Sequence, residues 1–177
     1  AGWDTQADGQ GEDYAAGASY TLTEGDDVLY AQWEKDDSQV HTISYTVEYY
    51  KNGVRDDSKT QTVTDTNVWV NDDTIPVKTD EINTADAFGE HYEFVRTDPA
   101  EIPAEAADQT VIKVYYQGVE DSLTYSGNGA TSGSVAATEG RTGQDVTVAA
   151  NGFERTGYKF AGWDTQADGQ GEDYAAG

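Results

Sequence analysis

The first seventeen residues of the chain, AGWDTQADGQGEDYAAG, occur again without change at positions 161–177. The offset between the two copies is 160 residues, so the sequence covers one full period of a tandem array and a short overlap. Identity this complete indicates a recently amplified array, or a designed cut through one, rather than an ancient duplication. Serial copies are typical of stalks, filaments and multivalent surface proteins, and an enzyme rarely needs them. The repetition therefore favours a chain of small units in series.

The charge and the missing residue types narrow the functional class. The formal net charge is −24, which argues against nucleic acid or an anionic membrane as a partner, because phosphate contacts need a basic face. It favours a soluble, self-repelling surface, weak cation binding or a cationic partner. The sequence has no cysteine, so disulfides, thiol nucleophiles and thiolate metal sites are excluded. No apolar run approaches the roughly 20 residues of a membrane-spanning helix.

Period-two alternation of apolar and polar residues predicts strands along most of the chain. Asn-Gly and Asp-Gly dipeptides separate these runs, as expected for turns. The predicted strands are 28–33, 42–49, 111–116 and 158–163, and the turns are Asp8-Gly9, Asn52-Gly53, Asn128-Gly129, Asn151-Gly152 and Asp168-Gly169. One short helix is predicted over 80–88, with Gly89 as its stop. The fold class is therefore mainly β, with less than about a fifth helix.

Two kinds of unit alternate along the chain. One unit opens and closes with strong strand patterns, whereas the other stops in mid-unit at the second copy of the repeat and is completed by residues 18–35. The predicted domains are 1–35 (the C-terminal part of one repeat unit), 41–119 (a complete unit) and 121–177 (the N-terminal part of the next repeat unit). The acidic, polar stretches 34–39 and 117–122 are predicted as linkers. Both are short, so they keep neighbouring units close to each other.

In the register 121–177 followed by 18–35, the sequence resembles the Listeria–Bacteroides repeat, also called the InlB B-repeat. That family is built on a G-Y-x-F-x-G-W core, a glycine-rich turn and a closing strand that ends in L-Y-A-x-W. The matching residues are Gly157, Tyr158, Phe160, Gly162, Trp163, Leu29, Tyr30, Ala31 and Trp33.

The unit 41–119 is similar to MucBP-type modules, through TVEYYKNG at its start and VIKVYY at its end. Its middle section, 65–109, is longer than that family leads us to expect. Both resemblances imply small ubiquitin-like β-grasp folds, of α+β type, in an extended repeat array. They also imply large, extracellular, wall-attached surface proteins of bacteria, many of which are adhesins or adhesion stalks.

No catalytic, cofactor-binding or metal-binding residue is predicted. Residues 164–173 place oxygen ligands at four positions of a calcium-loop template, but Ala175 stands where the bidentate Glu is required. An acidic loop is therefore the favoured interpretation, with calcium binding as the alternative. His41 and His91 lack zinc spacing, and no nucleophile motif is present. The glycine-rich stretch 127–140 lacks the lysine of a phosphate-binding loop.

The two tyrosine pairs Tyr49-Tyr50 and Tyr115-Tyr116 each place one ring on the outward face of a predicted strand. An outward ring could stack on a sugar or on a neighbouring unit. The favoured interpretation is that these rings stabilise strand pairs, which is the ordinary use of such residues.

Three functions follow from these observations, and an enzyme is the least supported of them. The first is a structural repeat segment of a bacterial cell-surface protein, an adhesin stalk or extracellular filament, whose partners are neighbouring repeats placed head to tail. The alternative is an adhesive module that binds mucin glycans or host proteins by multivalency. The ends of the chain are complementary, so we expect it either to be a slice of a continuous fibre or to associate end to end, with residues 1–35 of one copy completing 121–177 of the next. Trp163 or its copy Trp3 should pack near Trp33 in the completed unit.

Overall fold

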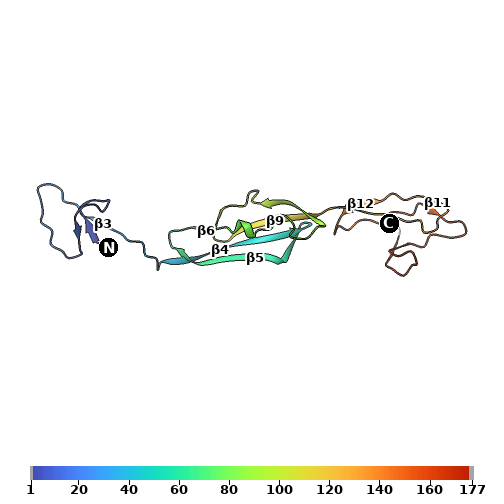
Figure 1. The fold of residues 1–177 in the computed structure, drawn as a ribbon, viewed down its shortest axis with the longest axis horizontal. Coiled ribbons are helices and arrows are strands. Elements are labelled where there is room, and N and C mark those ends of the chain that lie inside the picture. The colour runs from blue at the N-terminus through green and yellow to red at the C-terminus, as the bar shows by residue number, and fades with distance from the viewer. Residues whose placement is uncertain (1, 176–177) are drawn as a thin grey trace.

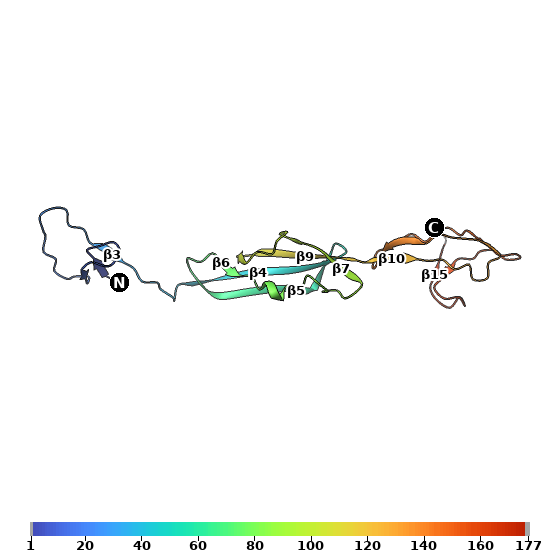
Figure 2. The ribbon, with the colours of Figure 1, turned by 45° about the horizontal axis from the view of Figure 1, so that its top comes forward.

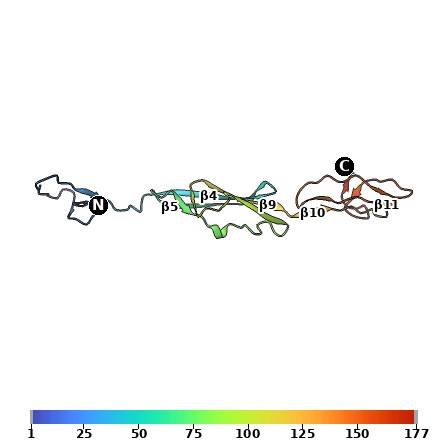
Figure 3. The same ribbon diagram turned by 90° about the horizontal axis from the view of Figure 1, so that it is seen from above.

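The chain forms three units placed end to end along one long axis (Figure 1). The structure is a computed structural model, and it describes residues 2–175. The N-terminus lies in the unit at one end and the C-terminus in the unit at the other, and turned views show the same order (Figures 2 and 3). The two copies of the repeated sequence are therefore separated by the whole central unit.

The central unit is a four-stranded mixed sheet with the strand order β5-β4-β9-β7. Its strands are β4 (Val40–Lys51), β5 (Val54–Trp69), β7 (Tyr92–Asp98) and β9 (Thr110–Gly118). β4 and β5 form an antiparallel hairpin, β9 runs parallel to β4, and β7 is antiparallel to β9. The hairpin turns at Asn52-Gly53, whose φ angles of 49° and 81° are those of a tight turn that Asn and Gly tolerate best. The predicted strands 42–49 and 111–116 are confirmed.

One face of this sheet forms the hydrophobic core. Alternate residues of β4 and β9 point to that face, and the short antiparallel strands β6 (Thr74–Pro76) and β8 (Glu105–Ala107) lie in the segments that cover it. The buried apolar residues are Ile43, Tyr45, Val47, Tyr49, Val68, Ile75, Val77, Ile82, Ala106, Ile112, Val114 and Tyr116. All of them belong to the central unit. It is the one unit in the described residues with a closed core.

The helix predicted over 80–88 is wrong. The structure has only the 3₁₀ turn η1 (Thr79–Glu81) there. The side-chain Oδ1 of Asn83 accepts hydrogen bonds from the N–H groups of Ala85 (2.9 Å) and Asp86 (3.0 Å). The backbone N–H of Asn83 donates to the buried Tyr49 hydroxyl at 2.8 Å. These side-chain bonds use the backbone donors that a helix would need.

The N-terminal unit is a small sheet of three short strands. These are β1 (Gly2–Asp4), β2 (Asp13–Tyr14) and β3 (Tyr30–Gln32), in the order β2-β1-β3 with both pairings antiparallel. The predicted strand 28–33 is present as β3. No apolar side chain of this unit is buried within the described residues, and Trp33 is 88% exposed. Trp33 therefore does not pack on Trp3 within one copy, and its packing on Trp163 of a neighbouring repeat stays a prediction.

The C-terminal unit consists of three separate two-stranded pairs. They are β10 (Glu120–Leu123) with β12 (Thr138–Arg141), β11 (Ser132–Gly133) with β13 (Phe153–Glu154), and β14 (Trp163–Asp164) with β15 (Asp173–Tyr174). The strand predicted at 158–163 is wrong except at Trp163, because a turn at Arg155–Tyr158 precedes it and Gly162 has a φ of 151°. The prediction of a mainly β fold is nevertheless confirmed.

Candidate functional site

The repeated sequence folds into the same hydrogen-bonded loop at both ends of the molecule. In the C-terminal copy, Asp164 Oδ1 accepts hydrogen bonds from the N–H groups of Gln166 (2.6 Å) and Gly171 (3.1 Å). Thr165 Oγ1 accepts another from the N–H of Glu172 at 3.0 Å. In the N-terminal copy, Asp4 Oδ1 and Thr5 Oγ1 accept the same three hydrogen bonds. The local sequence alone therefore determines this loop.

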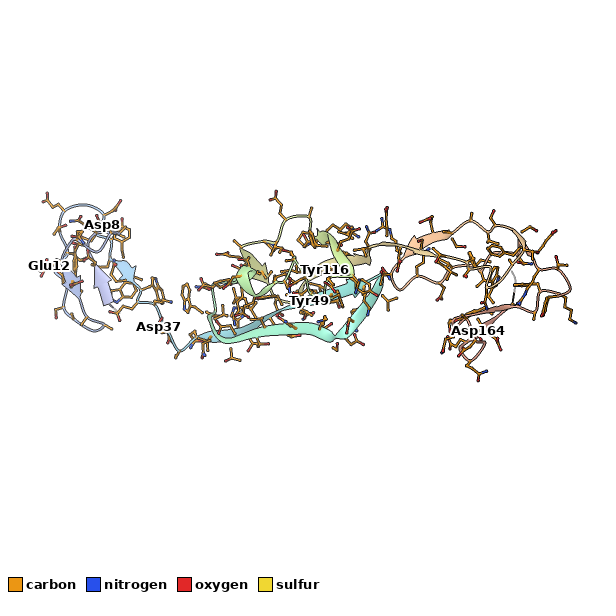
Figure 4. All side chains as sticks on the ribbon, turned by 45° about the vertical axis from the view of Figure 1, so that its right-hand side comes forward. Asp8, Glu12, Asp37, Tyr49, Tyr116 and Asp164 are labelled. Atoms are coloured by element: carbon orange, nitrogen blue, oxygen red, sulfur yellow. The ribbon has the colours of Figure 1, made fainter. Side chains whose placement is uncertain are left out.

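The acidic loop is closed by hydrogen bonds between its own residues. Figure 4 shows Asp8 and Glu12 in the N-terminal copy and Asp164 in the C-terminal one, at opposite ends of the chain. Oδ1 of Asp164 accepts backbone hydrogen bonds from its own loop, whereas Oδ2 of Asp164 and of Asp4 is buried without a hydrogen-bond partner among the described residues. Within residues 2–175, no three acidic or histidine side chains gather as a set that could hold a metal ion. What the loop does is turn the chain tightly between two paired strands.

Glycine at position 171 is required by the same close packing. A Cβ there would lie 2.2 Å from Thr165 Oγ1 and 2.6 Å from Asp164 Oδ1, and at Gly11 the corresponding distances are 2.3 and 2.4 Å. Any side chain would displace the two oxygen acceptors that close the loop.

An aromatic cluster surrounds Trp163 in the C-terminal unit. Its ring lies 4.8 Å from that of Tyr125, 5.0 Å from Phe160 and 6.1 Å from Phe153. Its Nε1–H donates to the carbonyl of Ala149 at 3.0 Å. The identical Trp3 has no such surroundings and is 43% exposed. One sequence therefore occupies two environments, of which only the C-terminal one contains the aromatic core.

The outward tyrosines of the central sheet pair with each other. Tyr50 and Tyr115 are register partners on β4 and β9, and their rings stack with centroids 4.8 Å apart. The guanidinium of Arg96 lies 4.0 Å from the Tyr115 ring centroid. Tyr49 and Tyr116, by contrast, point into the core (Figure 4). The outward rings thus support strand pairing, and Tyr115 makes ring contacts with both Tyr50 and Arg96.

A charged network continues from these rings. Glu48 Oε2 accepts a hydrogen bond from the Tyr50 hydroxyl, and Glu48 Oε1 accepts one from Arg55 Nη1, both at 2.8 Å. The hydrogen bond from Tyr50 and the Arg55 cation hold the pKa of Glu48 below its usual value, while the same bond raises the pKa of Tyr50. These residues form a stabilising surface network.

The two histidines lie in different surroundings. The Nε2 atom of His41 is 2.8 Å from the carbonyl oxygen of Asp72, and His91 lies 3.7 Å from Glu90 on the surface. Within residues 2–175, neither ring hydrogen-bonds to a serine or threonine hydroxyl. In the glycine-rich stretch, Asn128 Nδ2 donates to the carbonyl of Ala167 at 2.8 Å, so this segment supports the repeated loop.

Polar side chains bridge the central and C-terminal units at their junction, and no pattern in the sequence indicated this contact. Arg141 Nη1 donates to Glu93 Oε1 at 2.8 Å and to the carbonyl of Gly118 at 2.9 Å. Asn52 accepts a bond from the N–H of Gly118 at 2.8 Å and donates to the carbonyl of Thr142 at 3.0 Å. The four segments joined here, at Asn52, Glu93, Gly118 and 141–142, are distant in sequence. Each of these two side chains reaches both units, so the units meet through fixed polar contacts.

The stretch 117–122, predicted as a linker, joins the central and C-terminal units as strand rather than as irregular chain. These residues form the end of β9 and the start of β10, and the N–H of Val119 donates to the carbonyl of His91 at 3.0 Å. The stretch at 34–39 is different, because it contains no strand. It contacts the central unit through the Lys35 ammonium, 4.9 Å from the Trp69 ring centroid, and through the carbonyl of Gln39, which accepts a hydrogen bond from the N–H of Val70 at 2.8 Å. The central unit is thus joined to the C-terminal unit through strands and polar side chains, and to the N-terminal unit through a stretch without strands.

Comparison with known proteins gives one family match. Residues 122–177 match the family model of the Listeria-Bacteroides repeat domain, a domain found in bacterial surface proteins. The match confirms the resemblance for the C-terminal unit. No curated protein and no solved structure shows significant similarity to the chain. In the described part of the chain, no helix is long and apolar enough to cross a membrane.

Proposed function

We propose that this chain is a structural repeat segment of a large extracellular bacterial protein, which projects or links binding domains at the cell surface. The observation that carries the proposal is the end-to-end order of the units, with identical sequence at the two ends of a 160-residue period. Copies joined in this way extend along one axis. The family match of residues 122–177 supports the surface location, and we propose attachment to the cell wall.

We propose that the chain divides into 1–35, 41–119 and 121–177, and that the central unit is a β-grasp module of the MucBP-like kind. The sheet order β5-β4-β9-β7 supports this assignment, because the first and last strands of the unit are its parallel central pair. We also propose that its neighbours in the array are repeats of the same protein, placed head to tail.

The test compares a chain of one period with a chain of two periods by small-angle X-ray scattering. A structural spacer predicts that the maximum dimension grows by nearly the full length of a period. A two-period chain that folds back to the dimension of one period would contradict the proposal.

The adhesive alternative makes a different prediction, namely that one isolated period binds mucin glycans or a host protein on an array. The outward tyrosines do not favour it, because Tyr115 is already engaged by Tyr50 and Arg96. Binding by a single period would nevertheless establish it, since avidity can only amplify a contact that exists.

A further inference from the structure

Two tyrosine rings lie stacked across the two central strands of the four-stranded sheet. Tyr50 of β4 and Tyr115 of β9 are register partners, and their ring centroids are 4.8 Å apart with an angle of 25° between the ring planes. Both residues are partly exposed. β4 and β9 are the first and last strands of this sheet along the chain. The ring pair therefore connects two segments that are distant in the sequence.

The rest of the chain offers one other contact between tyrosine rings. Among the twelve tyrosines, the other ring pair within residues 2–175 is Tyr14 with Tyr20, whose centroids are 5.1 Å apart in an edge-on arrangement at 63°. These two residues are close in sequence and belong to the N-terminal unit. In the described part of the chain, Tyr50 and Tyr115 are thus the one tyrosine pair that joins distant strands.

A proton acceptor is already bound to one of the two hydroxyls. The Tyr50 hydroxyl donates to Glu48 Oε2 at 2.8 Å, and this bond raises the pKa of Tyr50, so the ring is a neutral phenol at neutral pH. A neutral phenol loses an electron more easily when its proton leaves at the same time. The same hydrogen bond and the Arg55 cation hold the pKa of Glu48 below its usual value, so Glu48 is ionised and can take up that proton.

We propose that Tyr50 and Tyr115 are a site of oxidative cross-linking, at which a one-electron oxidant joins the two rings as dityrosine. Each ring gives one electron to the oxidant and loses its hydroxyl proton, from Tyr50 to Glu48 and from Tyr115 to water. One ortho carbon of each ring then forms a carbon–carbon bond with the other. The hydrogen on each of these carbons moves to the hydroxyl oxygen as the rings become aromatic again. The net change is the loss of two electrons and two protons.

Arg96 determines which ring is oxidised first. Its guanidinium lies 4.0 Å from the centroid of the Tyr115 ring. A neighbouring cation disfavours the loss of an electron from a ring, so the first electron leaves Tyr50 and the second leaves Tyr115. The new bond also requires the stacked rings to slide until their edges meet. Partly exposed rings on the outward face have room for this movement, which rings in the core lack.

The cross-link closes a long loop around the core of the central unit. It spans 115 − 50 = 65 positions, and the chain has no cysteine that could form a comparable disulfide. A covalent link stabilises a fold mainly by restricting the unfolded chain, and the effect grows with the length of the loop. By analogy with a disulfide that closes a loop of this length, the melting temperature of the central unit should rise by roughly 10 °C or more.

The test oxidises the full 177-residue chain at low concentration with a small one-electron oxidant, photoexcited tris(bipyridyl)ruthenium(II) with persulfate. The monomeric fraction is digested with a protease and analysed by mass spectrometry. We expect a pair of peptides joined through Tyr50 and Tyr115, together with dityrosine fluorescence from the same fraction. A monomeric fraction that lacks this peptide pair would overturn the proposal.

Two variants and one change of conditions show whether the fold directs the reaction. Tyr50→Phe removes a hydroxyl that the coupling requires, so the linked peptides and the rise in melting temperature should both disappear. Tyr14→Phe removes the other ring pair and should leave both unchanged. Oxidation in concentrated denaturant should reduce the linked peptides to the level of other tyrosine combinations. Equal yields from folded and denatured chains, or a thermal gain that survives in Tyr50→Phe, would refute the proposal.

The proton step has its own pair of variants. Glu48→Gln keeps an oxygen that accepts the hydrogen bond but cannot take up a proton at neutral pH, so the yield of the link per dose of light should fall severalfold. Asp57→Asn is the matched control, because Asp57 pairs with Arg55 at 2.7 Å and, within residues 2–175, makes no hydrogen bond to Tyr50. Equal yields in the two variants would contradict the role of Glu48.

Discussion

Replacing Arg141 with alanine should loosen the junction between the central and C-terminal units without unfolding either one. The side chain makes two hydrogen bonds of 2.8 and 2.9 Å that join β12 to β7 and β9, and it lies 3.6 Å from Glu120. Arg141 is 34% exposed and Glu93 is 51% exposed, so solvent screening reduces the ion-pair contribution. We estimate a loss of about 1–2 kcal/mol at the junction, which changes the fraction of closed junctions by about 5- to 30-fold.

Spin labels on an otherwise cysteine-free chain measure this effect directly. One label at Gln61→Cys in the central unit and one at Ser134→Cys in the C-terminal unit give a distance distribution by pulsed electron resonance. The parent should give a narrow distribution and Arg141→Ala a broad one. The matched control is Arg155→Ala, which also removes an arginine but one that lies 4.1 Å from the Tyr158 ring within a single unit. A distribution of unchanged width in the Arg141 variant would refute the role of these contacts.

Three further predictions concern stability. Tyr116→Phe should destabilise the central unit by about 1–2 kcal/mol, because the carbonyl of Asn83 loses the hydroxyl that donates to it at 2.9 Å. Tyr115→Phe, at an outward position, is the control in denaturant titrations. Equal losses of stability in the two variants would contradict the argument. Gly171→Ala should destabilise the repeated loop, seen as faster amide exchange at Gln166, and unchanged exchange would show that the loop tolerates a Cβ. The backbone hydrogen bond from Ser44 lowers the pKa of Asp108, so the stabilisation by the ionised carboxylate is present at neutral pH and is lost as the pH falls below about 4. Asp108→Asn should therefore unfold more easily than the parent at pH 7 but not at pH 2. A difference in melting temperature that persists in acid would count against this prediction.

The sequence predicts the central sheet well because its signals are local. Alternation along 42–49 identifies the buried face of β4, and Asn52-Gly53 identifies the hairpin that follows it. The repeated loop is also local, which is why its two copies fold alike in different surroundings. Patterns that depend on few neighbours can be read without the structure.

The errors arise where distant residues decide the backbone. The helix at 80–88 is lost because hydroxyls from β4 and β9 bind its backbone groups. The strand at 158–163 is lost except at Trp163, because the turn at Arg155–Tyr158 and the φ of 151° at Gly162 take the backbone out of an extended path. The supposed linker at 117–122 is fixed by Arg141 and Asn52, which no local pattern places there. Composition at a junction resembles composition in a linker, so only the structure separates them.

The parallel pairing of β4 with β9 has a mechanical consequence. The chain enters the central unit at the start of β4 and leaves it at the end of β9, and seven register pairs from Tyr45–Thr110 to Lys51–Tyr116 join the two strands. Because the strands run in the same direction, tension on the chain pulls them past each other and loads these hydrogen bonds together rather than one at a time. A tethered surface protein experiences such tension whenever flow or a moving target pulls on its tip. The central unit is therefore built to resist pulling, and single-molecule stretching should show it unfolding at higher force than either end unit.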